Sequence, residues 1–169
     1  MDNLVSNGAQ SKPVMTPCVG ICSTVFGDHV CRGCKRFAHE IVAWNSYSNE
    51  QKQLVENRLT LLLAQILEPH FEVVDAELLQ QRLTEQSIRF NRSRQPLCWV
   101  MDLLRAGAGQ IQDPAQWGFR MLNDAGTSAE RLLALRQQLD QQLFSLAEAH
   151  YQRYLKPDYR PSAQNADGS

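Results

Sequence analysis

Four of the five cysteines of this 169-residue chain lie within one stretch of 17 residues. They form two close pairs, with three residues inside the first pair, eight between the pairs and two inside the second: Cys18, Cys22, Cys31 and Cys34. A segment this short cannot bury a hydrophobic core of its own. The cysteines therefore constrain the fold more than any other feature, because something besides apolar packing must order them.

Two cysteine pairs at this spacing are typical of a tetrahedral metal site. Four thiolates can surround one ion, and in zinc sites the sulfurs lie about 2.3 Å from the metal. Gly20 and Gly33 lie inside the two pairs and permit tight turns. Gly27 and Asp28 supply turn residues for the loop between the pairs. We therefore expect the four cysteines to be the ligands of one metal centre.

The spacing alone does not choose the metal, because zinc and iron–sulfur clusters both accept four thiolates. The second pair runs directly into an expected helix, as in many zinc knuckles, so Zn²⁺ is the first expectation. The three residues inside the first pair, 19–21, are uncharged and could direct their amides at cluster sulfides. An iron–sulfur cluster is therefore the close alternative.

The second cysteine pair also fits a different chemistry. Cys31 and Cys34 form a C-x-x-C motif beside a helix start, where thiolates are stabilised, which would suit thiol–disulfide chemistry. Such chemistry does not require the upstream pair. His29 is expected to be a loop histidine, since four cysteines complete the shell. Cys98 lies in the apolar run LCWVM and is expected to be an inert core residue.

Composition and charge restrict the class of protein. The net charge is −1, which does not suggest a strongly basic nucleic-acid binder. No stretch approaches the roughly 20 apolar residues of a membrane span, and the N-terminus lacks the basic and apolar regions of a signal peptide. We expect a cytoplasmic protein that does not bind membranes, and in that compartment clustered thiols more often bind metal than form disulfides.

The hydrophobic pattern predicts a mostly α fold: a small N-terminal metal-binding cysteine knuckle followed by a helical domain of about four to five helices. No strand is expected. The expected divisions are a flexible tail (1–15), the cysteine module with its following helices (16–68), the helical domain (70–155) and a second flexible tail (156–169).

Local signals predict where the helices begin and end. A short helix is expected over 37–44. Ser48 and Gln51 form a capping box that opens a helix ending before Pro69. A helix over 76–89 is expected to be capped by Asp75, and one over 96–106 to begin at Pro96 and end before Gly107. A helix over 114–123 is expected to be capped by Asp113 and closed by Gly126. The longest expected helix starts at a Thr127–Glu130 capping box and runs to about 155. This last helix is amphipathic and is expected to pack within the chain.

The stretches TPCVGIC, CRGCKR, EIVAW and SNEQK resemble the small bacterial family catalogued as domain of unknown function 1289, whose members are often labelled predicted iron–sulfur proteins. The resemblance covers about residues 16–60, with the cysteines, Arg36, Glu40, Ile41 and Trp44 in register. It implies a metal-binding cysteine module of unestablished biochemical role. Phe37 departs from the threonine that the family usually has there, which would form a capping box with Glu40.

Arg89, Arg92 and Arg94 lie beside Phe90 and could grip phosphate or stack on bases. A solvated helix end is the simpler interpretation.

No phosphate-binding glycine loop, nucleophile elbow or zinc-protease motif is present, so we lean against an enzyme. The first expectation is a non-catalytic metal-binding protein whose four-cysteine module orders a surface for a protein partner, or for nucleic acid. The alternatives are an iron–sulfur protein with a redox or sensing role and, third, a thiol–disulfide enzyme using Cys31 and Cys34.

Overall fold

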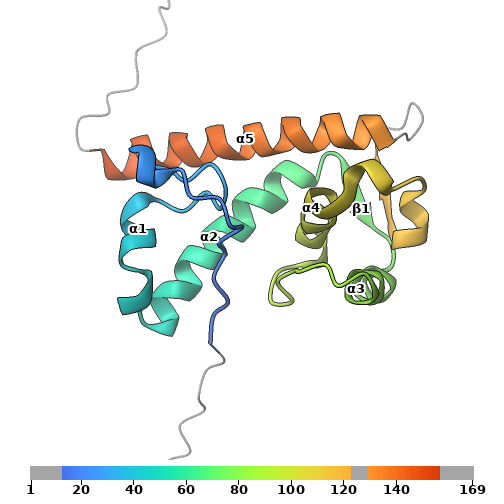
Figure 1. The fold of residues 1–169 in the computed structure, drawn as a ribbon, viewed down its shortest axis with the longest axis horizontal. Helices are drawn as coiled ribbons and strands as arrows, with labels where there is room; N and C mark the ends of the chain where they lie inside the picture. The colour runs from blue at the N-terminus through green and yellow to red at the C-terminus, as the bar shows by residue number, and fades with distance from the viewer. Residues whose placement is uncertain (1–12, 123–128, 157–169) are drawn as a thin grey trace, which may run out of the picture.

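The computed structural model describes residues 13–122 and 129–156, and this part of the chain is mostly α-helical, as expected. Its helices are α1 (Ala38–Val42), α2 (Asn49–Leu67), α3 (Ala76–Glu85), α4 (Pro96–Gly107) and α5 (Ala129–Leu155). Its strands are β1 (Phe71–Val73) and β2 (Phe119–Met121). Figure 1 shows α5 along one side of the whole fold, with the cysteine-bearing loops and α1 under one end and α4 and α3 under the other. None of these helices is both long and apolar enough to cross a membrane.

The helix starts that depend on local capping are confirmed. The Ser48 hydroxyl accepts a hydrogen bond from the Gln51 amide at 3.3 Å, and the Gln51 side chain accepts one from the Ser48 amide at 2.9 Å. The Asp75 carboxylate accepts a bond from the Leu78 amide at the start of α3. Pro96 is the first residue of α4. Each signal satisfies or removes an amide that has no partner inside its helix.

The expectation of no strand is wrong. β1 pairs antiparallel with β2, so that Phe71 lies opposite Met121 and Val73 lies opposite Phe119. Phe71 and Phe119 are buried with their rings in edge contact, 5.8 Å between centroids. The ribbon therefore contributes aromatic side chains to the core.

The expected helix 114–123 is also wrong. Asp113 does cap a helical turn, but this is a short 3-10 turn, η4 (Pro114–Trp117). Gly118 then takes a left-handed conformation with φ of 79°, and its carbonyl accepts the amides of Val74 and Asp75 at 2.9 Å. A Cβ atom there would lie 2.3 Å from the Asp75 carbonyl oxygen. The close approach to the Asp75 backbone thus requires glycine at the turn that leads into β2.

Two other boundaries differ from the prediction. α3 ends at Glu85 and not at 89, because Ser87 adopts a positive φ of 54° that takes the chain out of the helix. The expected helix 37–44 is divided into α1 and a 3-10 turn, η2 (Trp44–Ser46). The Thr127 cap, Gly126 and the expected tails, apart from 13–15 and 156, lie outside the described residues.

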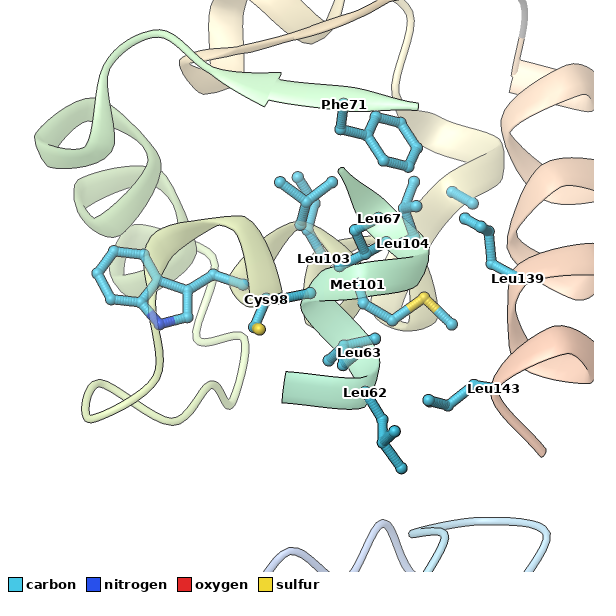
Figure 2. Packing of buried hydrophobic residues seen from close by; sticks show 14 of the residues in the cluster. Leu62, Leu63, Leu67, Phe71, Cys98, Met101, Leu103, Leu104, Leu139 and Leu143 are labelled. Carbon is cyan, nitrogen blue, oxygen red and sulfur yellow. The ribbon is translucent and has the colours of Figure 1, made fainter. Parts of the chain in front are cut away.

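The core forms where α2, α4 and α5 pack against one another. Leu67 of α2, Met101 of α4 and Leu139 of α5 are each no more than 1% exposed, and Figure 2 shows them with their neighbours. The same cluster includes Val30 and Phe37 from the cysteine module. The long helix α5 therefore packs within the chain, as predicted, and one core spans both sides of residue 69.

Candidate metal centre

The second cysteine pair lies in a tight turn that leads into α1. Val30 and Phe37 form an isolated antiparallel bridge, and the Cys31 amide donates to the Arg36 carbonyl at 2.9 Å. Lys35 takes a positive φ of 61° inside this turn. Both Cys31 and Cys34 are buried there as free thiols.

The polar surroundings of these two sulfurs differ. Burial acts to raise the pKa of Cys31, but backbone hydrogen bonds from Cys34, Ser23 and Gly33 together lower it below its ordinary value. Burial raises the pKa of Cys34 above its ordinary value, although the Arg36 Nε atom donates to its sulfur at 3.3 Å. The turn thus directs amides and a guanidinium at thiols that would be ionised in a metal site.

The loop of the first pair packs directly on the second pair. A Cβ atom on Gly33 would lie 2.5 Å from the Ile21 carbonyl oxygen and 2.9 Å from Val19 Cγ2. The Cys31 Sγ atom is 3.4 Å from the same Ile21 oxygen. The Arg32 amide donates to the Ser23 hydroxyl at 2.9 Å. The fold therefore brings the two turns that carry the four cysteines into contact.

The four sulfurs themselves are not gathered into one coordination shell. Within the described residues, no three His, Cys, Asp or Glu side chains are grouped so that they could hold a metal ion. Cys18 and Cys22 are partly exposed, and the Cys22 Sγ atom contacts the Thr24 hydroxyl at 3.1 Å. The ligand assignment of Cys18, Cys22, Cys31 and Cys34 stays a prediction.

His29 and Cys98, which are not expected to be ligands, have other neighbours. His29 is exposed, and its ring stacks on Tyr151 of α5 with 5.1 Å between centroids. Cys98 is 0% exposed, and burial raises its pKa to about 11. Cys98 is thus a core thiol, as expected.

Sequence reasoning missed the burial of Lys35, which is 1% exposed. Its ammonium donates to the Arg32 and Gly33 carbonyls of the cysteine turn and to Asp140 of α5. Arg105 of α4 also donates to Asp140, at 3.2 Å. Nothing in the local sequence identifies this lysine as buried, because its carboxylate partner is distant in the chain.

The residues that follow the second pair are fixed around Glu40. This carboxylate accepts the Phe37 amide at 2.8 Å and the Arg58 guanidinium at 2.6 Å. Glu40 therefore still caps α1 although Phe37 replaces the expected threonine, since the acidic half of the capping box needs only the backbone amide. Arg36 lies over the Trp44 ring, 4.8 Å from its centroid.

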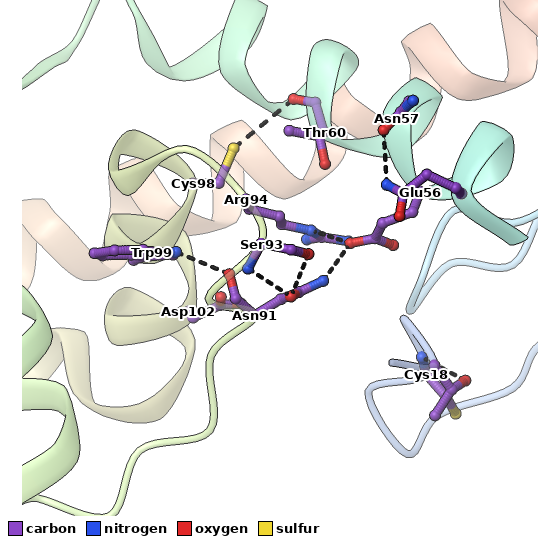
Figure 3. A network of polar contacts seen from close by, with 12 residues as sticks. Cys18, Glu56, Asn57, Thr60, Asn91, Ser93, Arg94, Cys98, Trp99 and Asp102 are labelled. Atoms are coloured by element: carbon purple, nitrogen blue, oxygen red, sulfur yellow. Dashed lines mark hydrogen bonds and ion pairs between the residues drawn. The ribbon is translucent and has the colours of Figure 1, made fainter. Parts of the chain in front are cut away.

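The three arginines of 89–94 do not act as one surface cluster. Arg94 points inward, where its Nε atom lies 2.6 Å from the buried Glu56 carboxylate, as Figure 3 shows. Arg89 donates to the Thr16 carbonyl at 3.2 Å, and Arg92 lies over the Phe90 ring. Contact of these residues with nucleic acid stays a prediction.

Comparison with known proteins bears on the cysteine module. Residues 16–62 match the family model described as protein of unknown function (DUF1289), which confirms the expected resemblance. The match covers the cysteine loops, α1 and most of α2, and leaves α3, α4 and α5 outside it. No curated protein and no solved structure matches the chain. The segment that carries the two cysteine pairs thus matches the DUF1289 family model, and this match covers only that part of the chain.

Proposed function

We propose that this chain is a non-catalytic cytoplasmic metal-binding protein in which Cys18, Cys22, Cys31 and Cys34 hold one metal ion. The contact of Gly33 with Val19 and Ile21 carries the proposal, because it holds the two cysteine turns against one another. The donor set also fits, since all four residues are free thiols of the kind that zinc prefers. When bound, the metal supplies cross-links that order the loops.

The charges beside the second pair support the same assignment. Four thiolates around a divalent zinc leave a net negative charge. Lys35 and Arg36 are both buried beside the cysteine turn, and Arg36 already donates to the Cys34 sulfur. These cations would offset the charge of the filled site.

The ordered module would present an apolar surface to a protein partner. Val25 and Phe26 form the 3-10 turn η1 (Thr24–Phe26) between the cysteine pairs, and they are 73% and 89% exposed. Ile21, in the loop of the first pair, is 68% exposed. Exposed apolar side chains grouped on one loop are characteristic of protein interaction sites. A protein partner is therefore favoured over nucleic acid.

An iron–sulfur protein with a redox or sensing role is the second candidate. The Gly20 amide lies 3.4 Å from the Cys18 sulfur, the kind of contact that also tunes clusters. Anaerobic purification followed by absorption and elemental analysis separates the two candidates. One zinc per chain without a visible band supports the first. Iron with matching sulfide and a visible band bleached by dithionite supports the second.

Single variants test which residues bind the metal. Cys18→Ala, Cys22→Ala, Cys31→Ala and Cys34→Ala should each lose the metal and the protection of residues 18–37 against hydrogen exchange. Cys98→Ala is the matched control and should keep one metal per chain. A Cys98→Ala variant that loses the metal while Cys18→Ala retains it would overturn the assignment. A metal-free wild type with a Cys31–Cys34 disulfide would instead favour the thiol–disulfide alternative.

A further inference from the structure

A cavity of about 550 Å³ lies between the cysteine loops and the helical part of the chain. One wall is formed by Met15 to Val19 and the second cysteine turn, and the opposite wall by the segment 86–91. Figure 3 shows Cys18 on its loop across from Asn91 and Arg94. This volume falls in the range of about 300–1,000 Å³ that small-molecule sites occupy.

Part of the lining is apolar. The side chains that provide it come from α2, the 86–91 segment and α5: Leu59, Leu63, Ile88, Phe90 and Leu143. Phe90 is held in place by Trp99, with 5.2 Å between ring centroids. These residues suit the hydrocarbon or aromatic body of a ligand.

The charged part of the lining is dominated by cations, and most of them are already paired. Arg94 binds Glu56, Arg105 binds Asp140, and Lys35 also binds Asp140. Arg89 also lines the cavity, and in the part of the chain that the structure describes it forms no ion pair. It donates to the Thr16 carbonyl, which leaves further donors of its guanidinium for a ligand.

Backbone strain is concentrated on the same walls. Across residues 13–122 and 129–156, Lys35 and Ser87 are the non-glycine residues with positive φ, and both line the cavity. Such strain persists only where the surroundings enforce it, and it is enriched at binding sites. Ser87 is an exposed residue of the cavity wall, two positions before Arg89.

We propose that this cavity binds a small organic anion. Its carboxylate or phosphate head contacts Arg89 and Ser87, because a guanidinium and a hydroxyl together supply several donors to anionic oxygens. Its apolar body lies against Leu63 and Phe90. The site does not depend on the proposed metal function, although Cys18 and Cys34 form part of its wall.

The test is an NMR titration of the ¹⁵N-labelled protein, as purified, with benzoate, phenyl phosphate and benzyl alcohol. These probes share a ring and differ in the head. At least one anion should produce saturable chemical-shift changes in the amides of residues 86–91. The affinity of the neutral alcohol should be lower by roughly tenfold or more. The stronger of the two anions identifies the head. No saturable shift from either anion, or equal affinity for the alcohol, overturns the proposal.

Variants localise the head of the ligand. Arg89→Gln should weaken the anion about tenfold, because a hydrogen-bonded charge contact is lost. Arg92→Gln makes the same charge change three positions further along the chain but lies off the cavity wall, so it should leave affinity within about twofold. If both variants weakened anion binding equally, the effect would come from the overall charge of the protein, and the proposed contact with Arg89 would be wrong.

Arg89→Gln also removes the hydrogen bond from Arg89 to the Thr16 carbonyl, which could move that side of the cavity. Two further variants therefore test the site without changing this contact. Ser87→Gly removes the hydroxyl and retains a residue that tolerates positive φ, and it should weaken binding several-fold. Ala106→Trp fills the cavity from α4 without changing charge, and it should abolish the shifts. Unchanged affinity in both variants contradicts the proposal.

Discussion

The Nζ atom of Lys35 lies 2.7 Å from Oδ1 of Asp140, although the two residues are 105 positions apart in the chain. The same ammonium donates to carbonyls inside the second cysteine turn. The buried ammonium of Lys35 therefore links the second cysteine turn to α5. The cysteine module and the helical core are thus joined by a direct ion pair.

Asp140→Asn should lower the free energy of unfolding by about 2 kcal/mol, because Lys35 then keeps its charge without a carboxylate. The loss stays below that of a fully buried pair, since the Asp140 side chain is 39% exposed. Urea denaturation measures it. Glu148→Gln, at an exposed position of the same helix, is the control, and equal stability of the two variants would show that the contact contributes nothing.

Arg94→Met should destabilise the protein by about 3 kcal/mol, because it leaves the Glu56 carboxylate buried without a cation. Glu56 is 1% exposed, and one of its oxygens already has no hydrogen-bond partner within the described structure. The double variant Glu56→Met with Arg94→Met should lose less stability than Arg94→Met alone. A double variant at least as unstable as the single one, in the same denaturation assay, would contradict this account of the network.

The buried Asp102 carboxyl should contribute to the pH dependence of the free energy of unfolding. Burial raises its pKa above the ordinary 3.8, against the attraction of Arg94 and Arg105. As pH rises above 3.8, the unfolded chain releases this proton before the folded chain does, so the folded state loses stability through that window. Asp102→Asn lacks this loss. Its stability relative to the wild type should therefore increase as the pH rises above the ordinary carboxyl pKa of 3.8, and a difference that stays constant over a series of urea midpoints would refute it.

Gly33→Ala should separate the two cysteine turns, because its Cβ atom would lie 2.5 Å from the Ile21 oxygen. A backbone clash of this kind costs about 1–3 kcal/mol, which corresponds to a loss of metal affinity of about 5- to 150-fold. Competition with a chromophoric chelator measures the affinity. Gly109→Ala, where a Cβ atom has no neighbour within 4 Å, should bind as the wild type does. Equal affinities in both variants would mean that the contact between the turns does not matter.

Features encoded within a few residues could be predicted from the sequence. Ser48, Asp75 and Pro96 mark helix starts because capping and proline geometry act locally. The cysteine spacing likewise identified the segment that matches DUF1289.

Features made by distant partners could not. β1 has three residues, and its partner strand lies 48 positions further on, as in the pair Glu72 and Arg120. The prediction of a helix over 114–123 is wrong because Gly118 approaches the Asp75 backbone closely and ends the helical turn. The buried state of Lys35 likewise depends on Asp140, which no local pattern connects to it.

The central claim is that one metal ion is bound by four cysteine sulfurs. X-ray absorption at the metal edge counts the ligands directly, on protein purified without oxygen. The account predicts one zinc per chain with four sulfur neighbours at about 2.3 Å, and the same shell in Cys98→Ala. A shell with nitrogen or oxygen in place of any sulfur, or a chain that holds no metal, would contradict it.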